Sequence, residues 1–230
     1  MTQVSRRHLL AGAAGAAAVY GAATAHAATT SDLNICAAPK FDESFDLVVI
    51  GSGGAGLSSA VMAKQQGVKR ILVLEKMAFL GGNTAISGGG FNSYDPPRQQ
   101  AQGIKDSPEL HFENTYDGGD RRANPELVHA MTENSYAAIQ WLESIGMKFK
   151  PNVYQIYGGL YPRCHAPYGS LGSDYIKVLK AQCDKLGIEI RTNSRVVRVL
   201  RESPLEGKVT GVEYVDKSGK KHVIEATLSV

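Results

Sequence analysis

The most regular pattern of apolar residues in the chain lies at 46–74, where a strand-like run is followed by apolar positions at helical spacing and by a second strand-like run. The run 46–50 is apolar after its first residue, Asp46, and largely β-branched, which is typical of a strand buried in a parallel sheet. From 55 to 66 the apolar positions recur with helical spacing, and Gly67 provides a helix stop. Residues 71–74 form a second apolar run that ends at Glu75. This order predicts a strand–helix–strand unit.

Two helices are predicted further along, each with a polar cap and a proline at its start. Ser107 precedes Pro108, and Asn124 precedes Pro125, in the order that favours a helix N-terminus. The segment 94–106 carries prolines and polar side chains, which indicates an irregular surface excursion. The second helix is predicted to be long, with an apolar face made of Leu127, Met131, Ala138, Leu142 and Ile145.

The rest of the chain combines a glycine-rich segment, one more helix and several strands. An irregular segment is predicted at 157–169 and an amphipathic helix at 172–186. Apolar and β-branched runs separated by glycine-containing turns predict an antiparallel meander. The meander strands are predicted at 195–201, 208–215 and 221–226, and two separate short strands are predicted at 147–151 and 188–190.

These elements predict an α/β fold. We expect a Rossmann-like fold with a parallel sheet, an antiparallel β-meander and helical insertions. Residues 227–230 are predicted to begin a further strand that returns beside the first one. No helix or polar tail follows them in the printed sequence, so we expect the sequence to be cut short there.

The turn after the first strand carries candidate chemistry. Gly51, Gly53 and Gly56 form the pattern G-x-G-x-x-G, in which glycines permit a sharp turn and a close approach of phosphate to the backbone. The helix N-terminus behind them offers free N–H groups and the positive end of a dipole. Glu75, at the tip of the second strand, can accept hydrogen bonds from ribose hydroxyls. The unit predicts dinucleotide binding; a structural glycine turn is the alternative.

A second glycine-rich segment, at 81–92, follows that strand. Its glycines require either positive φ angles or a close backbone approach, which a plain surface loop would also use. Asn83, Thr84 and Ser87 add neutral hydrogen-bonding groups. Since the segment begins close to Glu75, we predict that it forms a second wall of the cofactor site.

The N-terminus has the pattern of a targeting segment. Arg6 and Arg7 form a twin-arginine pair before an apolar run, and Ala25-His26-Ala27 is a cleavage signal. We therefore predict a twin-arginine signal peptide over 1–27, a linker over 28–44 and export to the periplasm. Residues 45–230 are left for the dinucleotide-binding domain, which the resemblance described below identifies as FAD-binding. The apolar run is too short for a stable membrane span, although an uncleaved N-terminal anchor is the alternative.

The composition and net charge of the chain limit the classes of binding partner that we expect. The chain has 230 residues, 43% of them hydrophobic and 20% charged, as in an ordinary globular protein. The net charge of +3 falls when the two arginines of the signal are removed, so neither nucleic acid nor an anionic membrane is indicated as a partner.

The 3 cysteines, Cys36, Cys164 and Cys183, make no disulfide framework, haem-attachment motif or metal-ligand spacing. Arg163, Cys164 and His165 stand together, but no orienting third group is evident for catalysis. We interpret these three residues as part of a buried loop in which the Arg and His side chains bind backbone carbonyls.

Taken together, the motifs resemble a known family. The motifs are VVIGSGGAGLSSA at 48–60, LEK at 74–76, GGNTAISGGGFN at 81–92, SPELHFENTYDGGD at 107–120, NPELVHAMTENSYAAIQWLESIG at 124–146, PRCHAP at 162–167 and NSRVVRVL at 193–200. They resemble the FAD-binding domain of the fumarate reductase and succinate dehydrogenase flavoproteins, in particular the soluble periplasmic flavocytochrome c type.

The resemblance implies bound FAD, anaerobic respiration and reduction of an activated C=C bond by hydride from flavin N5. Fumarate is the default acceptor; urocanate, methacrylate and aryl acrylates are reduced by related enzymes, and ketosteroid dehydrogenases share the first two motifs. A small unsaturated carboxylic acid is thus the expected substrate. Because this chain has no haem motif, the resemblance implies that a separate cytochrome c-type subunit donates electrons.

Carried over by position, the resemblance also implies a set of FAD contacts. The adenine contacts are made by the main chain of Val197 or its neighbour Val196, and the adenosine ribose contacts by Glu75 and Lys76. The pyrophosphate contacts are Gly51, Ser52, Gly53, Gly54, Ala55 and Gly56. The flavin side is lined by Gly82, Asn83, Thr84, Ser87, Gly89 and Gly90.

The resemblance places no catalytic residue in this chain. The capping domain and the residues that grip the acid and deliver the proton are expected beyond Val230, and neither Arg163 nor His165 matches the catalytic acid. Three alternatives remain open. They are a non-catalytic flavin-binding remnant, another FAD-dependent dehydrogenase such as a ketosteroid dehydrogenase-like or urocanate reductase-like enzyme, and an NAD-dependent dehydrogenase that uses only the strand–helix–strand unit.

Overall fold

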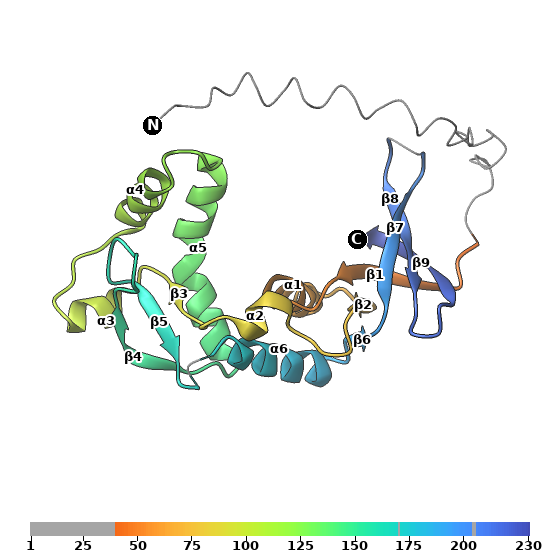
Figure 1. Ribbon diagram of the computed structural model, residues 1–230, viewed down its shortest axis with the longest axis horizontal. Helices are drawn as coiled ribbons and strands as arrows, with labels where there is room; N and C mark the ends of the chain where they lie inside the picture. The colour runs from red at the N-terminus through yellow and green to blue at the C-terminus, as the bar shows by residue number, and fades with distance from the viewer. Residues whose placement is uncertain (1–39, 170, 204–205) are drawn as a thin grey trace, which may run out of the picture. The chain divides into compact units, whose positions relative to one another are not determined.

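The computed structural model describes residues 40–169, 171–203 and 206–230, which all belong to one unit of the chain (Figure 1). The predicted signal peptide at 1–27, Cys36 and most of the predicted linker lie outside the described residues. The linker was predicted to extend to 44, but strand β1 already begins at Glu43. The backbone N–H of Asp42 also donates to Val223 O at 2.8 Å, so the sheet pairing reaches past the predicted boundary.

A mixed sheet forms the centre of the unit. Its order is β6-β2-β1-β9-β8-β7. The four neighbouring strands β6, β2, β1 and β9 run parallel, and β9, β8 and β7 form the predicted antiparallel meander. This architecture confirms the predicted α/β fold. The bounds are β1 Glu43–Ile50, β2 Ile71–Leu74, β6 Glu189–Arg191, β7 Arg195–Arg201, β8 Val209–Val215 and β9 Lys221–Ser229.

The prediction about the end of the chain was right in placing residues 227–229 in a strand beside the first one, but wrong in making it a further strand. Residues 227–229 do not begin a new strand but continue β9, which itself lies beside β1. The pairing runs from Glu43 with Ile224 to Leu47 with Ser229, through one irregularity in register. A single strand therefore serves both as the last arm of the meander and as the parallel neighbour of the nucleotide-binding strand.

Helices pack on the sheet as the apolar pattern requires. Helix α1, Gly54–Gln65, connects β1 to β2 and buries Leu57, Ala60 and Val61. Helix α6, Ser173–Lys185, packs against it and buries Ile176, Leu179 and Cys183 in the same cluster. A second apolar cluster contains Val48, Leu72, Val212 and Ile224. Because alternate residues of β1 and β2 contribute to each cluster, these strands are buried on both faces.

The helical insertions contain elements that the sequence pattern did not reveal. The segment predicted to be irregular at 94–106 contains α3, Pro96–Ala101, whose N-terminus is capped by Asp95 accepting from the N–H of Arg98. The glycine segment at 81–92 contains a short helix, α2, Gly82–Ile86. Helices α4, Pro108–Gly118, and α5, Pro125–Ser144, begin at the predicted caps, Ser107 and Asn124.

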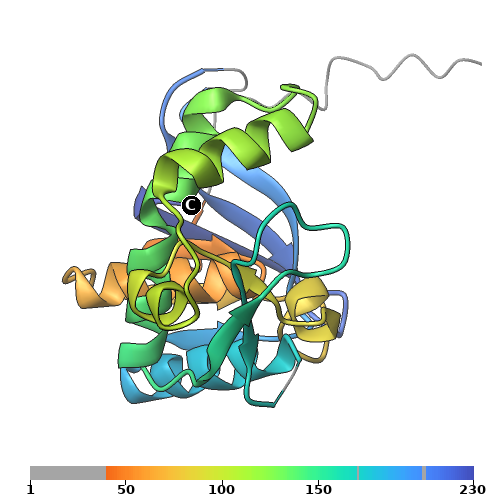
Figure 2. The same ribbon diagram turned by 90° about the vertical axis from the view of Figure 1, so that its left-hand side faces the viewer.

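A small antiparallel sheet of order β3-β5-β4 lies among these insertions (Figures 1 and 2). Its strands are β3, Phe91–Asn92, β4, Phe149–Tyr154, and β5, Cys164–Pro167. The segment 157–169 was therefore wrongly predicted to be wholly irregular, and the strand predicted at 147–151 lies slightly further along the chain. In both cases the strand is short and depends on partners distant in sequence, so local periodicity could not identify it.

The buried face of α5 also differs from the prediction. Leu127 and Met131 are exposed by 69% and 44%, whereas Val128, Thr132, Ser135, Ile139 and Leu142 are buried. The helix is rotated because polar groups inside the unit bind it: Ser93 Oγ donates to Ser135 Oγ at 3.1 Å. Trp141 donates to Gln65 on α1 at 3.0 Å. Within the described residues, no helix has the length and apolarity needed to cross a membrane.

The rotation of α5 gives a stability prediction. Ile139→Ala should lower the free energy of unfolding by about 2–5 kcal/mol, because a fully buried side chain is replaced by a cavity. Leu127→Ala on the same helix should change it by less than about 0.5 kcal/mol, since this side chain is exposed. Urea denaturation monitored by circular dichroism measures both. If the two substitutions lowered the free energy of unfolding equally, or Leu127→Ala lowered it more, the buried face of α5 would be the one predicted from the sequence.

Candidate cofactor site

The turn from β1 to α1 has the geometry of a phosphate-binding loop. Gly51 has a φ of +95°, which L side chains rarely adopt. At Gly56 an added Cβ would lie 2.1 Å from the carbonyl oxygen of Gly51, so only glycine permits this approach of helix and strand. In the first turn of α1, the N–H groups of Ala55 and Gly56 have no acceptor within the described residues. They are therefore free to bind an anion at the positive end of the helix dipole.

Glu75 connects the two strand ends. Its Oε2 accepts hydrogen bonds from the Ser52 N–H at 3.0 Å and from Ser52 Oγ at 2.6 Å, and its Oε1 accepts from the Met77 N–H at 2.8 Å. Burial raises the pKa of Glu75, but these bonds outweigh it and the pKa lies below its ordinary value. Since a carboxylate has about four acceptor positions, roughly one remains for the ribose hydroxyl predicted from the sequence.

The second glycine segment lies directly against the first. The N–H of Gly54 donates to Thr84 Oγ1 at 3.0 Å, and the N–H of Gly81 donates to Ser52 Oγ at 3.2 Å. A Cβ at Gly172, before α6, would lie 1.9 Å from the carbonyl oxygen of Thr84. Three segments far apart in sequence therefore meet at one point, as predicted for the first two of them.

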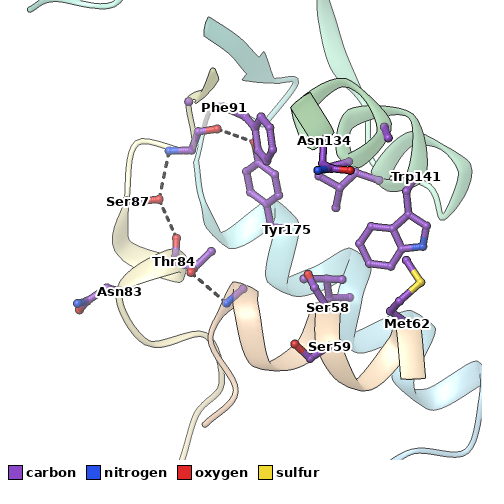
Figure 3. A pocket seen from close by; sticks show the side chains of 17 residues that line it. Ser58, Ser59, Met62, Asn83, Thr84, Ser87, Phe91, Asn134, Trp141 and Tyr175 are labelled. Atoms are coloured by element: carbon purple, nitrogen blue, oxygen red, sulfur yellow. Dashed lines mark hydrogen bonds between the residues drawn. The ribbon is translucent and has the colours of Figure 1, made fainter. Parts of the chain in front are cut away.

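A cavity of about 840 Å³ lies beside this point (Figure 3). Figure 3 shows Trp141 and Met62 at one end of its lining and Thr84 and Ser87 at the other. The cavity is large enough for the flavin half of a dinucleotide, and its lining is mostly apolar, as small-molecule sites usually are. The predicted contacts among its lining residues are Gly54, Asn83, Thr84, Ser87, Gly89 and Gly90.

Several residues of this cavity were not among the predicted contacts. Tyr175 is buried, and its hydroxyl donates to the carbonyl oxygen of Gly89 at 2.8 Å. Burial raises the pKa of Tyr175, so the hydroxyl stays neutral and holds the glycine segment in place. Trp141 and Asn134 line the cavity from α5. Their sequence pattern predicts only a core position, and no local signal relates them to the glycine segments.

A second cavity, of about 430 Å³, brings together Lys76 and Val197 of the predicted adenosine contacts. Its lining also includes Asn193, Arg195 and Lys217. The N–H of Ser194 donates to Glu75 O at 2.8 Å and that of Asn193 to Met77 O at 2.9 Å, which holds this segment against the end of β2. The predicted contacts that line neither cavity are Gly51, Ser52, Gly53, Ala55, Gly56, Glu75 and Gly82. Most of them form the connecting turn.

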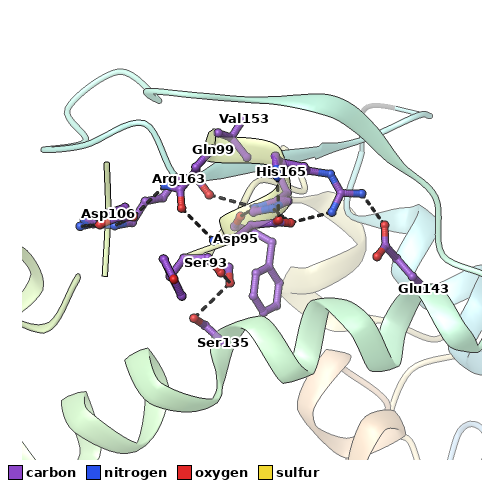
Figure 4. Close-up of polar contacts among 12 residues, drawn as sticks. Ser93, Asp95, Gln99, Asp106, Ser135, Glu143, Val153, Arg163 and His165 are labelled. Carbon is purple, nitrogen blue, oxygen red and sulfur yellow. Dashed lines mark hydrogen bonds and ion pairs between the residues drawn. The ribbon is translucent and has the colours of Figure 1, made fainter. Parts of the chain in front are cut away.

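Arg163 and His165 occupy structural positions (Figure 4). His165 is fully buried; its Nδ1 lies 3.1 Å from Phe91 O and its Nε2 lies 3.0 Å from Asp95 Oδ2. Arg163 binds the carboxylate of Asp106 at 2.5 and 2.7 Å. The interpretation as a buried structural loop thus holds for His165, whereas Arg163 binds a carboxylate instead of carbonyls. In the part of the chain that the structure describes, no cluster of three His, Cys, Asp or Glu residues could hold a metal ion.

A parallel sheet with a glycine turn at its centre, free helical N–H groups and a cavity beside it define a dinucleotide-binding domain. The chain belongs to the FAD binding domain family, whose model matches residues 46–230. This match confirms the resemblance noted from the motifs, and it identifies FAD as the dinucleotide.

Named relatives share this domain. The chain is 36% identical over 172 residues to the "Fumarate reductase (cytochrome)" of Shewanella frigidimarina, covering 74% of this chain and 29% of that protein. It is 31% identical over 234 residues to the "Acrylate reductase flavoprotein subunit" of Shewanella woodyi, covering 99% and 45%. The open conformation of a flavocytochrome c3 fumarate reductase superposes with a TM-score of 0.75 and 31% identity, covering 81% of this chain and 33% of that one. The chain thus spans less than half of each relative.

The buried Glu75 carboxylate predicts a specific pH dependence. Glu75→Gln should lower the free energy of unfolding at pH 7 by about 1–3 kcal/mol, because the amide cannot accept from both Ser52 and Met77. The folded-state pKa of Glu75 is below its ordinary value of 4.5, so the stabilisation is complete above that pH and is lost as the pH falls through the folded-state pKa.

Urea midpoints of the wild type and Glu75→Gln should therefore converge as the pH is lowered from 7 towards 3. Glu113→Gln, at an exposed α4 position with no hydrogen bond or ion pair within the described residues, is the control and should behave as the wild type. A gap between wild type and Glu75→Gln that stays constant with pH would contradict the ionised, hydrogen-bonded state of Glu75.

Proposed function

We propose that this chain is the FAD-binding part of an exported oxidoreductase that reduces an activated C=C bond in an unsaturated carboxylic acid. The acceptor is fumarate or a related unsaturated acid. The observation that carries this proposal is the 840 Å³ cavity, at which the two glycine segments and the N-terminus of α1 meet. The fumarate and acrylate reductases among the relatives support the substrate class.

The chain's own residues fit the FAD molecule in three parts. The free N–H groups of Ala55 and Gly56 bind the pyrophosphate. Glu75 and Lys76 hold the adenosine ribose, and the main chain of Val197 approaches the adenine at the smaller cavity. The flavin lies in the larger cavity against the backbone of Gly89 and Gly90, which Tyr175 fixes. Bound there, FAD supplies hydride transfer to an alkene carbon.

The electron donor and the location of the protein are part of the same proposal. The twin-arginine pair and the cleavage signal at 25–27 support export to the periplasm. A separate cytochrome c-type subunit would supply electrons to the flavin. The groups that bind the acid and deliver its proton are expected beyond Val230, so none of the described residues is assigned as the catalytic acid.

Flavin binding is the first test. Gly56→Ala should raise the dissociation constant for FAD by about tenfold or more, because the added Cβ would force the α1 N-terminus away from the β1 turn. Gly67→Ala is the matched control. It adds one methyl group in the same strand–helix–strand unit, at a residue with a φ of +96°, and no atom lies within 4 Å of the added Cβ. It should reduce stability by about 1 kcal/mol and leave FAD affinity unchanged.

The measurements are FAD content after purification and fluorescence titration of the apoprotein. A wild-type chain that releases no FAD on denaturation and does not bind it in titration would refute the proposal. Release of NAD instead would restore the dehydrogenase alternative.

Turnover is the second test. The chain loaded with FAD should oxidise reduced viologen only slowly, with fumarate or acrylate as acceptor, since the acid-binding groups are expected elsewhere. Flavin reoxidation monitored at its visible absorbance band measures this directly. Rapid turnover with either acid would place the catalytic groups within these 230 residues and overturn that part of the proposal.

A further inference from the structure

A third cavity, of about 540 Å³, adjoins the flavin cavity. The two share the lining residues Gly90, Phe91, Asn134 and Ala138, so they meet at strand β3 and at one face of α5. The remaining lining residues are Asn92, His111, Thr115, Ala130, Met131 and Ser135. We name this cavity the neutral subsite.

None of the described residues that line the neutral subsite carries a carboxylate, an ammonium or a guanidinium group. His111 is its one titratable group among them, and it is neutral at physiological pH, because burial and then the nearby Arg163 lower its pKa to about 4. Arg163 itself is paired with Asp106, as described above. A carboxylate placed in this cavity would find no cation among its described lining residues with which to pair.

The polar groups of the neutral subsite suit an uncharged hydrogen-bonding ligand. His111 is exposed by only 4%, and its Nδ1 has no hydrogen-bond partner in the part of the chain that the structure describes. A buried polar atom of this kind is rare in folded proteins, and a bound ligand would satisfy it. Asn134 uses its Nδ2 on Ala130 O, which leaves its Oδ1 as an acceptor. Phe91, Met131 and Ala138 provide apolar surface.

We infer that the neutral subsite receives the uncharged body of the acid substrate, an aryl or alkyl group with at most a neutral polar substituent, beside the flavin. The substrate is then an unsaturated monocarboxylic acid, and its single carboxylate lies outside this subsite. Fumarate, with a carboxylate at each end, fits the subsite poorly. This inference rests on the proposed function, which places the flavin in the neighbouring cavity and makes an unsaturated acid the substrate.

The test uses cinnamamide, an uncharged aryl acrylamide, as a probe of the whole chain with and without FAD. Saturation-transfer NMR should detect binding in both states, and excess fumarate should not displace the probe. Met131→Glu, which introduces a charge on the subsite lining, should weaken binding about tenfold or more. Leu127→Glu, one turn earlier on α5 and outside both cavities, is the matched control and should bind as the wild type.

A second variant tests the role of the unpartnered nitrogen. His111→Phe keeps an aromatic ring and removes Nδ1, so it should weaken cinnamamide several-fold. It should leave unchanged the binding of β-methylstyrene, which has the same ring and alkene but no hydrogen-bonding group.

The outcomes separate this inference from the proposed function. Three outcomes would overturn the neutral subsite and leave FAD binding intact. The first is normal FAD binding without cinnamamide binding, and the second is displacement of the probe by fumarate. The third is an equal loss of cinnamamide affinity in Met131→Glu and Leu127→Glu. Failure to bind FAD, together with cinnamamide binding that only Met131→Glu weakens, would overturn the proposed function while retaining the subsite.

Discussion

The hydrogen bonds between Ser52 and the buried carboxylate of Glu75 hold the cofactor site together. They join the turn after β1 to the end of β2, and Ser52 Oγ also accepts from the N–H of Gly81, which attaches the second glycine segment. Because the N–H of Ser52 is used in this way, the groups left free for a phosphate are those of Ala55 and Gly56. One buried pair thus sets the positions of both glycine segments and of the anion-binding end of α1.

Around that pair, the helical insertions determine what the site can hold. Tyr175 from α6 fixes the carbonyl of Gly89, and the buried His165 lies against the carbonyl of Phe91, so the backbone between the two cavities is held from two elements. Helix α5 contributes Asn134 and Ala138 to both cavities. In the proposed function, the strand–helix–strand unit holds the dinucleotide, and the helical insertions shape the two cavities beside it.

Local pattern was sufficient for the strand–helix–strand unit, the meander and the caps of α4 and α5. In each, the apolar period, the turn residues and the stop signals agree within a few residues of one another. The pattern failed at α3, at β5 and at the buried face of α5. Helix α3 is a short helix that begins with two prolines, and β5 is four residues long. Both are held by the hydrogen-bonded network of Asp95, Arg98 and His165. On α5, burial of Thr132 and Ser135 overrode the apolar stripe.

The sequence by itself determined that this chain binds a dinucleotide, because the glycines at 51, 53 and 56 and the acid at 75 are required at fixed spacing by backbone geometry. Only the tertiary structure decided which other residues line the two adjoining cavities. Tyr175, Trp141 and His111 come from helices whose own periodicity indicates nothing beyond burial. Their roles depend on which neighbouring segment each helix faces, and that is fixed by packing between residues far apart in the chain.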